Sequence, residues 1–168
     1  MTSLRSASTA RRRRAVAAVG AVGAGLLVLS ACDKPTPIST ITVGTSSVSS
    51  EASCYTDGDG DAKELKTAAV TECLKKDTAK DADVKSIKVD PDENVRFGVD
   101  PKIADKGWTI LLNGNPLTDS STKTYRTIPG SVFFNAQYGA QGNSTLVTIK
   151  EGETDVKGLW SFRLKKDS

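Results

Sequence analysis

The stretch GWTILLNGN, residues 107–115, indicates what kind of fold the chain adopts. Trp108, Ile110 and Leu112 alternate with other residues, which places their side chains on one face of a β-strand. Asn113-Gly114 follows at once, and this pair favours a two-residue hairpin because both residues tolerate positive φ. The stretch therefore predicts a strand that turns back into an antiparallel hairpin.

Short strand-like segments separated by turn residues lie on both sides of this stretch. They are ISTITVGTSSVSSEAS (38–53, a first strand that fades into a polar loop), VKSIKVD (84–90), NVRFGVD (94–100), TKTYRTI (122–128), STLVTIK (144–150) and KGLWSFRLKK (157–166). Six or seven such strands predict a mostly β domain, an antiparallel immunoglobulin-like β-sandwich, with a small β-barrel as the alternative.

Three features of the strand region are open to two interpretations. Asp100-Pro101 is predicted as a turn, and Trp108 as core rather than a ligand platform. Phe133 and Phe134 belong either to the core or to an exposed rim. The three strand arginines, Arg96, Arg126 and Arg163, are either a shared basic face or separately solvated charges.

Residues 61–76 are the helical candidate, because Ala62, Leu65, Ala69 and Cys73 recur at spacings of three and four. Asp61, three residues before Glu64, has the spacing of a capping box. The expected buried face has few large apolar side chains. We therefore expect a short helix held in place more by a disulfide than by packing.

The acidic run DGDGD, which begins at Asp57, has the alternation that opens a calcium-binding loop. Asp57, Asp59 and Asp61 fit the first three ligand positions, but Ala62 and Ala68 stand where the loop needs a glycine and a bidentate glutamate. We therefore interpret the run as a turn that begins the helix. A weak calcium site at the three aspartates is the alternative, and no other metal and no cofactor are expected.

The N-terminus has the pattern of an export signal. Arg5 and the arginines at 11–14 precede an apolar segment, residues 15–31, that contains no charge. A transmembrane anchor is the alternative, but 17 residues that include three glycines fall short of the roughly 20 apolar residues of a membrane span. Residues 1–31 are therefore predicted to be a signal peptide.

Leu29-Ser30-Ala31-Cys32 resembles the lipobox of bacterial lipoproteins. The resemblance implies cleavage before Cys32 and a diacylglycerol on its thiol, and its amine can be acylated as well. Each buried methylene of such chains contributes about 0.8 kcal/mol to membrane binding. We therefore expect a lipidated tether at 32–37 and one domain at 38–168, on the outer face of the cell membrane. Export by the general secretory or the twin-arginine route stays open.

Removal of residues 1–31 changes the charge of the protein. The leader holds five of the 23 basic residues and none of the 20 acidic ones, so 18 basic residues face 20 acidic ones in the mature chain. The basic stripe that nucleic-acid binding requires is then absent. We expect no nucleic-acid partner.

Cys54 and Cys73 are the two cysteines that remain once Cys32 is lipidated, which predicts a disulfide in an oxidising compartment. A two-cysteine metal site is the alternative, but it lacks further thiol or imidazole ligands. The chain contains no histidine at all, which excludes Ser-His-Asp and Cys-His catalysis and copper sites of the cupredoxin kind. We therefore do not expect an enzyme, although paired carboxylates stay open.

The stretches LSACDKPTP, SSEASCY, VRFGVDPKIADKGW, YRTIPGSVFF and WSFRLK together resemble uncharacterised actinomycete lipoproteins grouped as a domain of unknown function. The resemblance implies the lipidated Cys32 and carries no activity. Anchor, strands and missing catalytic residues together suggest a binding or interaction module for an envelope protein or a cell-wall polymer. The alternative is a small-ligand or ion carrier that delivers to a transporter.

Overall fold

The computed structural model describes residues 35–57, 64–79, 83–138, 140 and 142–167. The chain divides into two units, Met1–Cys32 and Asp33–Ser168, and the description below concerns the second. The predicted signal peptide, the predicted lipidation site Cys32, and Asp59 and Asp61 of the acidic run lie outside the described residues. None of the helices within those ranges has the length and apolar character that a membrane crossing requires.

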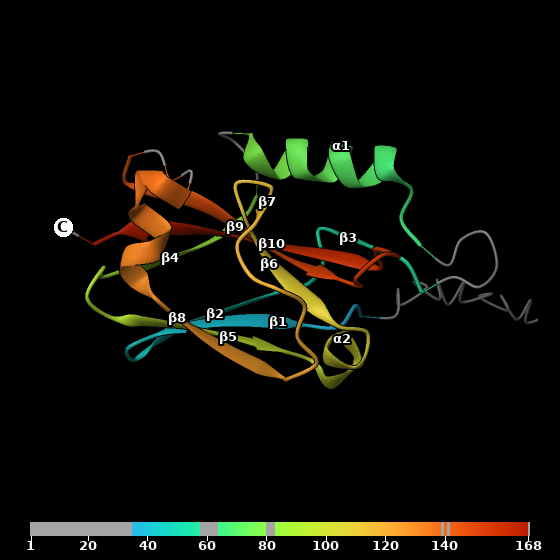
Figure 1. Cartoon of the computed structure of the whole chain (residues 1–168), viewed down its shortest axis with the longest axis horizontal. Coiled ribbons are helices and arrows are strands. Elements are labelled where there is room, and N and C mark those ends of the chain that lie inside the picture. The colour runs from blue at the N-terminus through green and yellow to red at the C-terminus, as the bar shows by residue number, and fades with distance from the viewer. Residues whose placement is uncertain (1–34, 58–63, 80–82, 139, 141, 168) are drawn as a thin grey trace, which may run out of the picture. The chain divides into compact units, whose positions relative to one another are not determined.

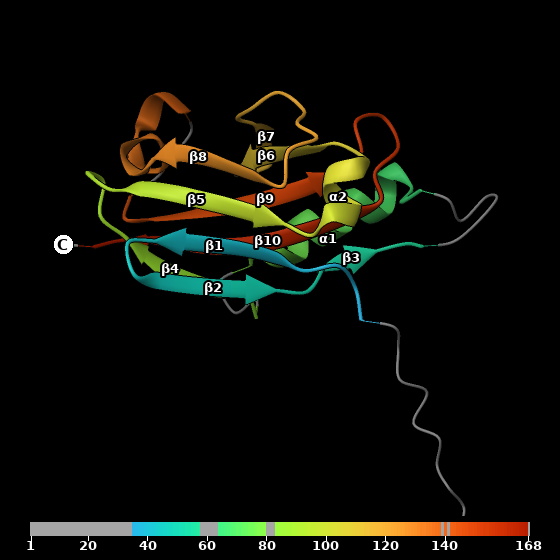
Figure 2. The same ribbon diagram turned by 90° about the horizontal axis from the view of Figure 1, so that it is seen from below.

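Two β-sheets lie face to face (Figures 1 and 2). Sheet A has the order β2-β1-β5-β8, with bounds Ser46–Ser50, Ser39–Val43, Asn94–Val99 and Tyr125–Pro129. Sheet B has the order β3-β10-β9-β6-β7, with bounds Cys54–Tyr55, Gly158–Lys166, Ser144–Glu151, Trp108–Leu112 and Asn115–Pro116, and β4 (Lys85–Val89) also pairs with β10. The β4–β10 pair is parallel and the others are antiparallel. The predicted immunoglobulin-like β-sandwich is confirmed.

The core lies between the two sheets, and β1, β4, β5, β6, β9 and β10 contribute alternate residues to it. Its fully buried side chains include Ile41 and Phe97 from sheet A, and Trp108, Trp160 and Phe162 from sheet B. Each large apolar side chain stabilises the fold by about 1.5–3 kcal/mol when it leaves water. Trp108 is therefore a core residue, as predicted.

The segment before β1 is bound to the sandwich. Trp160 Nε1 donates to the carbonyl oxygen of Pro37 at 2.7 Å, and the backbone amide of Ala52 donates to Thr36 Oγ1 at 3.1 Å. A buried indole N–H needs such an acceptor, because leaving it unpaired would cost the energy of its lost water contact. The expected tether, residues 32–37, is thus held against the domain from Thr36 onward.

The polar loop expected after the first strand is instead strand β2, so that prediction was wrong. Gly44, at φ +52°, reverses the chain, and β2 then pairs along the whole of β1. Hydroxyl pairs Thr40–Ser49 (2.8 Å) and Thr42–Ser47 (3.2 Å) join the two strands on their exposed side. A strand at the edge of a sheet is largely exposed, so a serine-rich sequence suffices for it.

Helix α1 (Thr67–Thr78) begins six residues later than predicted. Its N-cap is Lys66, which makes no side-chain cap, so the capping box expected from Asp61 and Glu64 was wrong. The backbone amide of Leu65 donates to the carbonyl oxygen of Val156 at 2.7 Å, in the β9–β10 turn. This contact with a distant segment holds residue 65 outside the helix.

Asp100-Pro101 begins a short helix, α2 (Pro101–Asp105), where only a turn was expected. Asp100 Oδ1 accepts from the amide of Lys102 at 2.9 Å, and Pro101 occupies the first turn. An aspartate cap followed by proline is a favoured helix start. Further along, Phe133 lies in the core and Phe134 is half-buried, within the 3₁₀ helix η2 (Gly130–Phe134); a second one, η3 (Ala136–Tyr138), follows.

Candidate functional site

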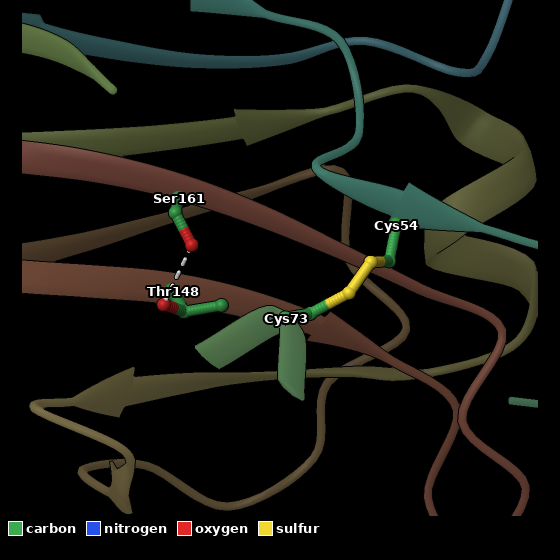
Figure 3. Close-up of a disulfide and its surroundings, with 4 residues drawn as sticks. All are labelled: Cys54, Cys73, Thr148 and Ser161. Carbon is green, nitrogen blue, oxygen red and sulfur yellow. Dashed lines mark hydrogen bonds between the residues drawn. A yellow bond between two sulfur atoms is a disulfide. The ribbon is translucent and has the colours of Figure 1, made fainter. Parts of the chain in front are cut away.

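Helix α1 covers the side of sheet B that faces away from sheet A (Figure 1). The buried side chains on this outer side of β6, β9 and β10 are both apolar and polar: Leu111, Leu146, Leu159, Thr109, Thr148 and Ser161. The hydroxyls of Thr148 and Ser161 pair at 3.0 Å, as Figure 3 shows. This layer therefore has a polar centre, unlike the apolar core between the sheets.

Covalent and polar contacts hold α1 on sheet B. Cys54 of β3 and Cys73 of α1 form the predicted disulfide, with their Cα atoms 6.4 Å apart (Figure 3). At the C-terminal end of the helix, Arg163 Nη2 donates to the carbonyl oxygens of Asp77 and Ala79 at 3.2 and 3.3 Å. A cation at a helix C-terminus also interacts favourably with the helix dipole. The expectation that the disulfide tethers a helix with few buried apolar residues is confirmed.

A pocket of about 480 Å³, which we call the disulfide pocket, opens beside this bond. Its lining comes from the β2–β3 connection, α1, the start of β4 and β10: residues 49–54, Cys73, Lys76, Asp77, 83–85 and Ser161. Most of these side chains are polar or charged. The volume lies within the range of small-molecule sites, about 300–1,000 Å³.

Asp77 is the buried acid of the disulfide pocket. Its side chain is 6% exposed, and Oδ2 has no hydrogen-bond partner among the described residues. Cys73 precedes it by four positions, so both side chains lie on the face of α1 that contacts sheet B. Buried polar atoms are paired in the great majority of cases. Asp77 lines the pocket, so a ligand that enters the pocket can approach the carboxyl of this residue.

Glu151, at the end of β9, is a second buried acid. It is 3% exposed, and its Oε2 also has no partner among the described residues. Burial raises its pKa to about 7, while Lys157 and Lys106 act to lower the pKa and Asp100 raises it further. Burial, and then the charge of Glu151, also raises the pKa of Tyr55.

A carboxyl with a pKa near 7 is chemically suited to general acid-base work. The pocket that opens next to Glu151 is small, about 250 Å³, and its lining consists of Lys106 and the turn residues 152–155 and 157, without Glu151. A substrate in it would not reach the acid. We therefore interpret Glu151 as a determinant of stability rather than of catalysis.

The predicted calcium ligands are only partly covered by the structure. Asp57 is exposed, and Asp59 and Asp61 are outside the described residues. Within the described ranges, no three Cys, Asp or Glu side chains are grouped so as to hold a metal ion. A weak calcium site at the acidic run stays a prediction.

The strand arginines do not form a shared basic face. Arg96 is on β5 of sheet A, whereas Arg163 is on β10 of sheet B, next to the end of α1. Arg126 Nη1 donates to the carbonyl oxygen of Asp119 at 2.9 Å. In the segment 131–142, Gln137 and Tyr138 line a pocket of about 330 Å³ against the β6–β7 hairpin.

Comparisons with known proteins do not assign this chain to a family. No protein-family model matches the chain, and no curated protein matches its sequence. Among solved structures, a chain of the fibronectin(III)-like modules of Clostridium thermocellum CbhA is similar at a TM-score of 0.34 and 12% identity, over 52% of this chain and 95% of that one. The assignment of the fold therefore rests on the two sheets described above.

Proposed function

We propose that this protein is an extracytoplasmic binding module, anchored by lipid on Cys32 and without catalytic activity, that binds a component of the cell envelope. The disulfide between Cys54 and Cys73 fits an exported domain, because such bonds persist in oxidising compartments. The leader and the lipobox-like sequence supply the anchor. The lack of histidine supports a role in binding rather than catalysis.

The main support for a binding role is the disulfide pocket. It combines a small-molecule volume with a buried carboxyl oxygen, on Asp77, that no described residue satisfies. A group that enters the pocket would replace the water contact that Asp77 loses on folding. The same volume suits the side group of a polymer or protein as well as a free solute.

The short tether would keep the pocket near the bilayer. Thr36 is four residues after Cys32, a separation of at most about 15 Å along the chain. The amide of Ala52, a residue that lines the pocket, donates to Thr36 Oγ1. The ligand is therefore expected at the membrane surface rather than deep in the cell wall.

The anchor is tested by Cys32→Ser in the full chain. We expect loss of palmitate labelling and release from the membrane fraction, whereas Cys73→Ser should keep both, because the disulfide takes no part in lipidation. A Cys32→Ser protein that remained labelled and membrane-bound would contradict the anchor.

The binding role is tested by crosslinking intact cells that express the full chain or its Asp77→Asn variant. We expect a crosslinked envelope component that the variant captures less well. Recovery of the protein alone under many crosslinking conditions would contradict the proposal.

The alternative, a carrier that hands a small solute to a transporter, is favoured by the pocket volume alone. A thermal-shift screen with calcium and common metabolites separates the two functions, because a ligand that binds the folded state raises the unfolding temperature. A reproducible rise with a free solute, without a crosslinked partner, would favour the carrier.

A further inference from the structure

We propose that the disulfide pocket recognises a primary amino group in its protonated, cationic form. This inference rests on the proposed binding function and names the chemistry of the group bound. The amine can belong to a free small molecule or to an envelope polymer, and the chemistry of recognition is the same for both.

The acceptor for this amine is Asp77. Its Oδ2 is buried, and none of the described residues donates a hydrogen bond to it. The nearby cation, Arg163, directs Nη2 to the backbone carbonyl oxygens of Asp77 and Ala79 instead. The guanidinium thus satisfies the end of the helix and, within the described part of the chain, leaves Oδ2 of Asp77 without a donor.

The charges that line the disulfide pocket also favour a cationic ligand. Lys76, Lys85, Glu51 and Asp83 are all exposed, so two positive and two negative charges balance at its rim. Asp77 is the buried acid among the lining residues, and the guanidinium of Arg163, which lies next to it, is engaged by backbone carbonyl oxygens. A cationic amine on a ligand would supply a charge-assisted donor for this acid.

An ammonium group fits this pocket better than a metal ion. Within the described parts of the chain, no three Cys, Asp or Glu side chains surround a common point, whereas a divalent cation needs several oxygen ligands. An ammonium has three N–H donors and needs only one strong acceptor. Ser161, whose hydroxyl pairs with that of Thr148, lines the same pocket and can accept a second bond.

The test measures the binding of matched pairs of ligands to the full chain in detergent by isothermal titration. The pairs are glucosamine against N-acetylglucosamine and putrescine against butanediol, which differ chiefly in the cationic amine. We expect each amine to bind at least about tenfold more tightly than its neutral counterpart, as expected for a charge-assisted hydrogen bond. This comparison uses the unaltered protein and so does not depend on whether a variant folds.

Two variants assign the effect to the acid. Asp77→Asn should abolish the preference for amines, whereas Asp83→Asn, an exposed carboxyl of the same pocket, should leave it within about twofold because water already screens its charge. An equal loss in both variants would contradict the assignment to Asp77. So would an unchanged preference in a folded Asp77→Asn protein.

The source of the amine is tested with purified cell wall, untreated or acetylated on its amino groups. Retention of the protein by the untreated wall alone supports a polymer amine, and binding of soluble amines without retention supports a free one. If neutral ligands bind as tightly as amines, this inference fails while the binding function stands. If no ligand binds and crosslinking recovers the protein alone, both fail.

Discussion

Replacement of Glu151 by glutamine is expected to remove a pH-dependent loss of stability. In the folded protein the carboxyl is buried, its Oε2 lacks a partner among the described residues, and burial raises its pKa from 4.5 to about 7. One pKa unit corresponds to 1.36 kcal/mol, so the protonated form is favoured by about 3 kcal/mol. Glutamine has nearly the same shape and carries no charge at any pH.

The direction of the effect follows from the two pKa values of Glu151. Between its ordinary value and about 7 the folded protein binds the proton while the unfolded chain has released it. The stabilisation is therefore fully present below about pH 4.5 and is lost as the pH rises through 7. Of the total, about 2 kcal/mol should be lost between about pH 5 and 7.5.

The measurement is urea unfolding of the wild type and of Glu151→Gln at several pH values in this window. We expect the free energy of unfolding of the wild type to fall with pH more steeply than that of the variant, by about 2 kcal/mol. Glu153→Gln is the matched control, because Glu153 is exposed two positions further on and should leave the slope unchanged. Equal slopes for the wild type and Glu151→Gln would refute the reasoning.

Three further changes test other parts of the structure, each by urea unfolding. Cys54→Ala should cost about 3 kcal/mol while circular dichroism still shows the strands, because the bond joins α1 to a sandwich with its own core; an unchanged stability would contradict this. Gly114→Ala should lower the free energy of unfolding by about 1 kcal/mol, because Gly114 has a φ of +86°. Gly152→Ala should lower it clearly more, because Gly152 has a φ of +89° and the added Cβ would also clash with a carbonyl oxygen. Equal losses of stability in the two variants would argue against that clash. Trp160→Phe should lower the free energy of unfolding by about 1–3 kcal/mol, because the hydrogen bond to Pro37 is lost. The segment before β1 should then be cleaved faster by protease, and an unaltered cleavage rate would show that this hydrogen bond does not hold the segment in place.

The strands of the sandwich could be predicted because the side chains that face the core recur at every second residue. β6 is the clearest example, since Trp108, Ile110 and Leu112 lie in the core and the hairpin after it has positive φ at Asn113 (49°) and Gly114 (86°). Alternation fails for β2, whose serine-rich sequence is paired but largely exposed. A pattern of hydrophobicity cannot reveal a strand that buries little apolar surface.

The candidate site was predicted only in part. Cys54 and Cys73 could be paired in advance because two cysteines remained once Cys32 was assigned to lipid. Asp77 was missed, although an acid four residues after a cysteine predicted to be buried lies on the same helical face. Its importance depends on the direction in which Arg163 donates, and no local pattern contains that information.

The sequence by itself determined the class of fold and the partners of the disulfide, because alternation and cysteine number are properties of neighbouring residues and of composition. Only the tertiary structure decided where α1 begins, that β4 pairs parallel to β10, and that Asp77 and Glu151 are buried. Each of these depends on segments that are far apart in the chain and meet only on folding. The physical reason is that desolvation of a carboxyl is set by everything packed around it, and not by the residues beside it in sequence.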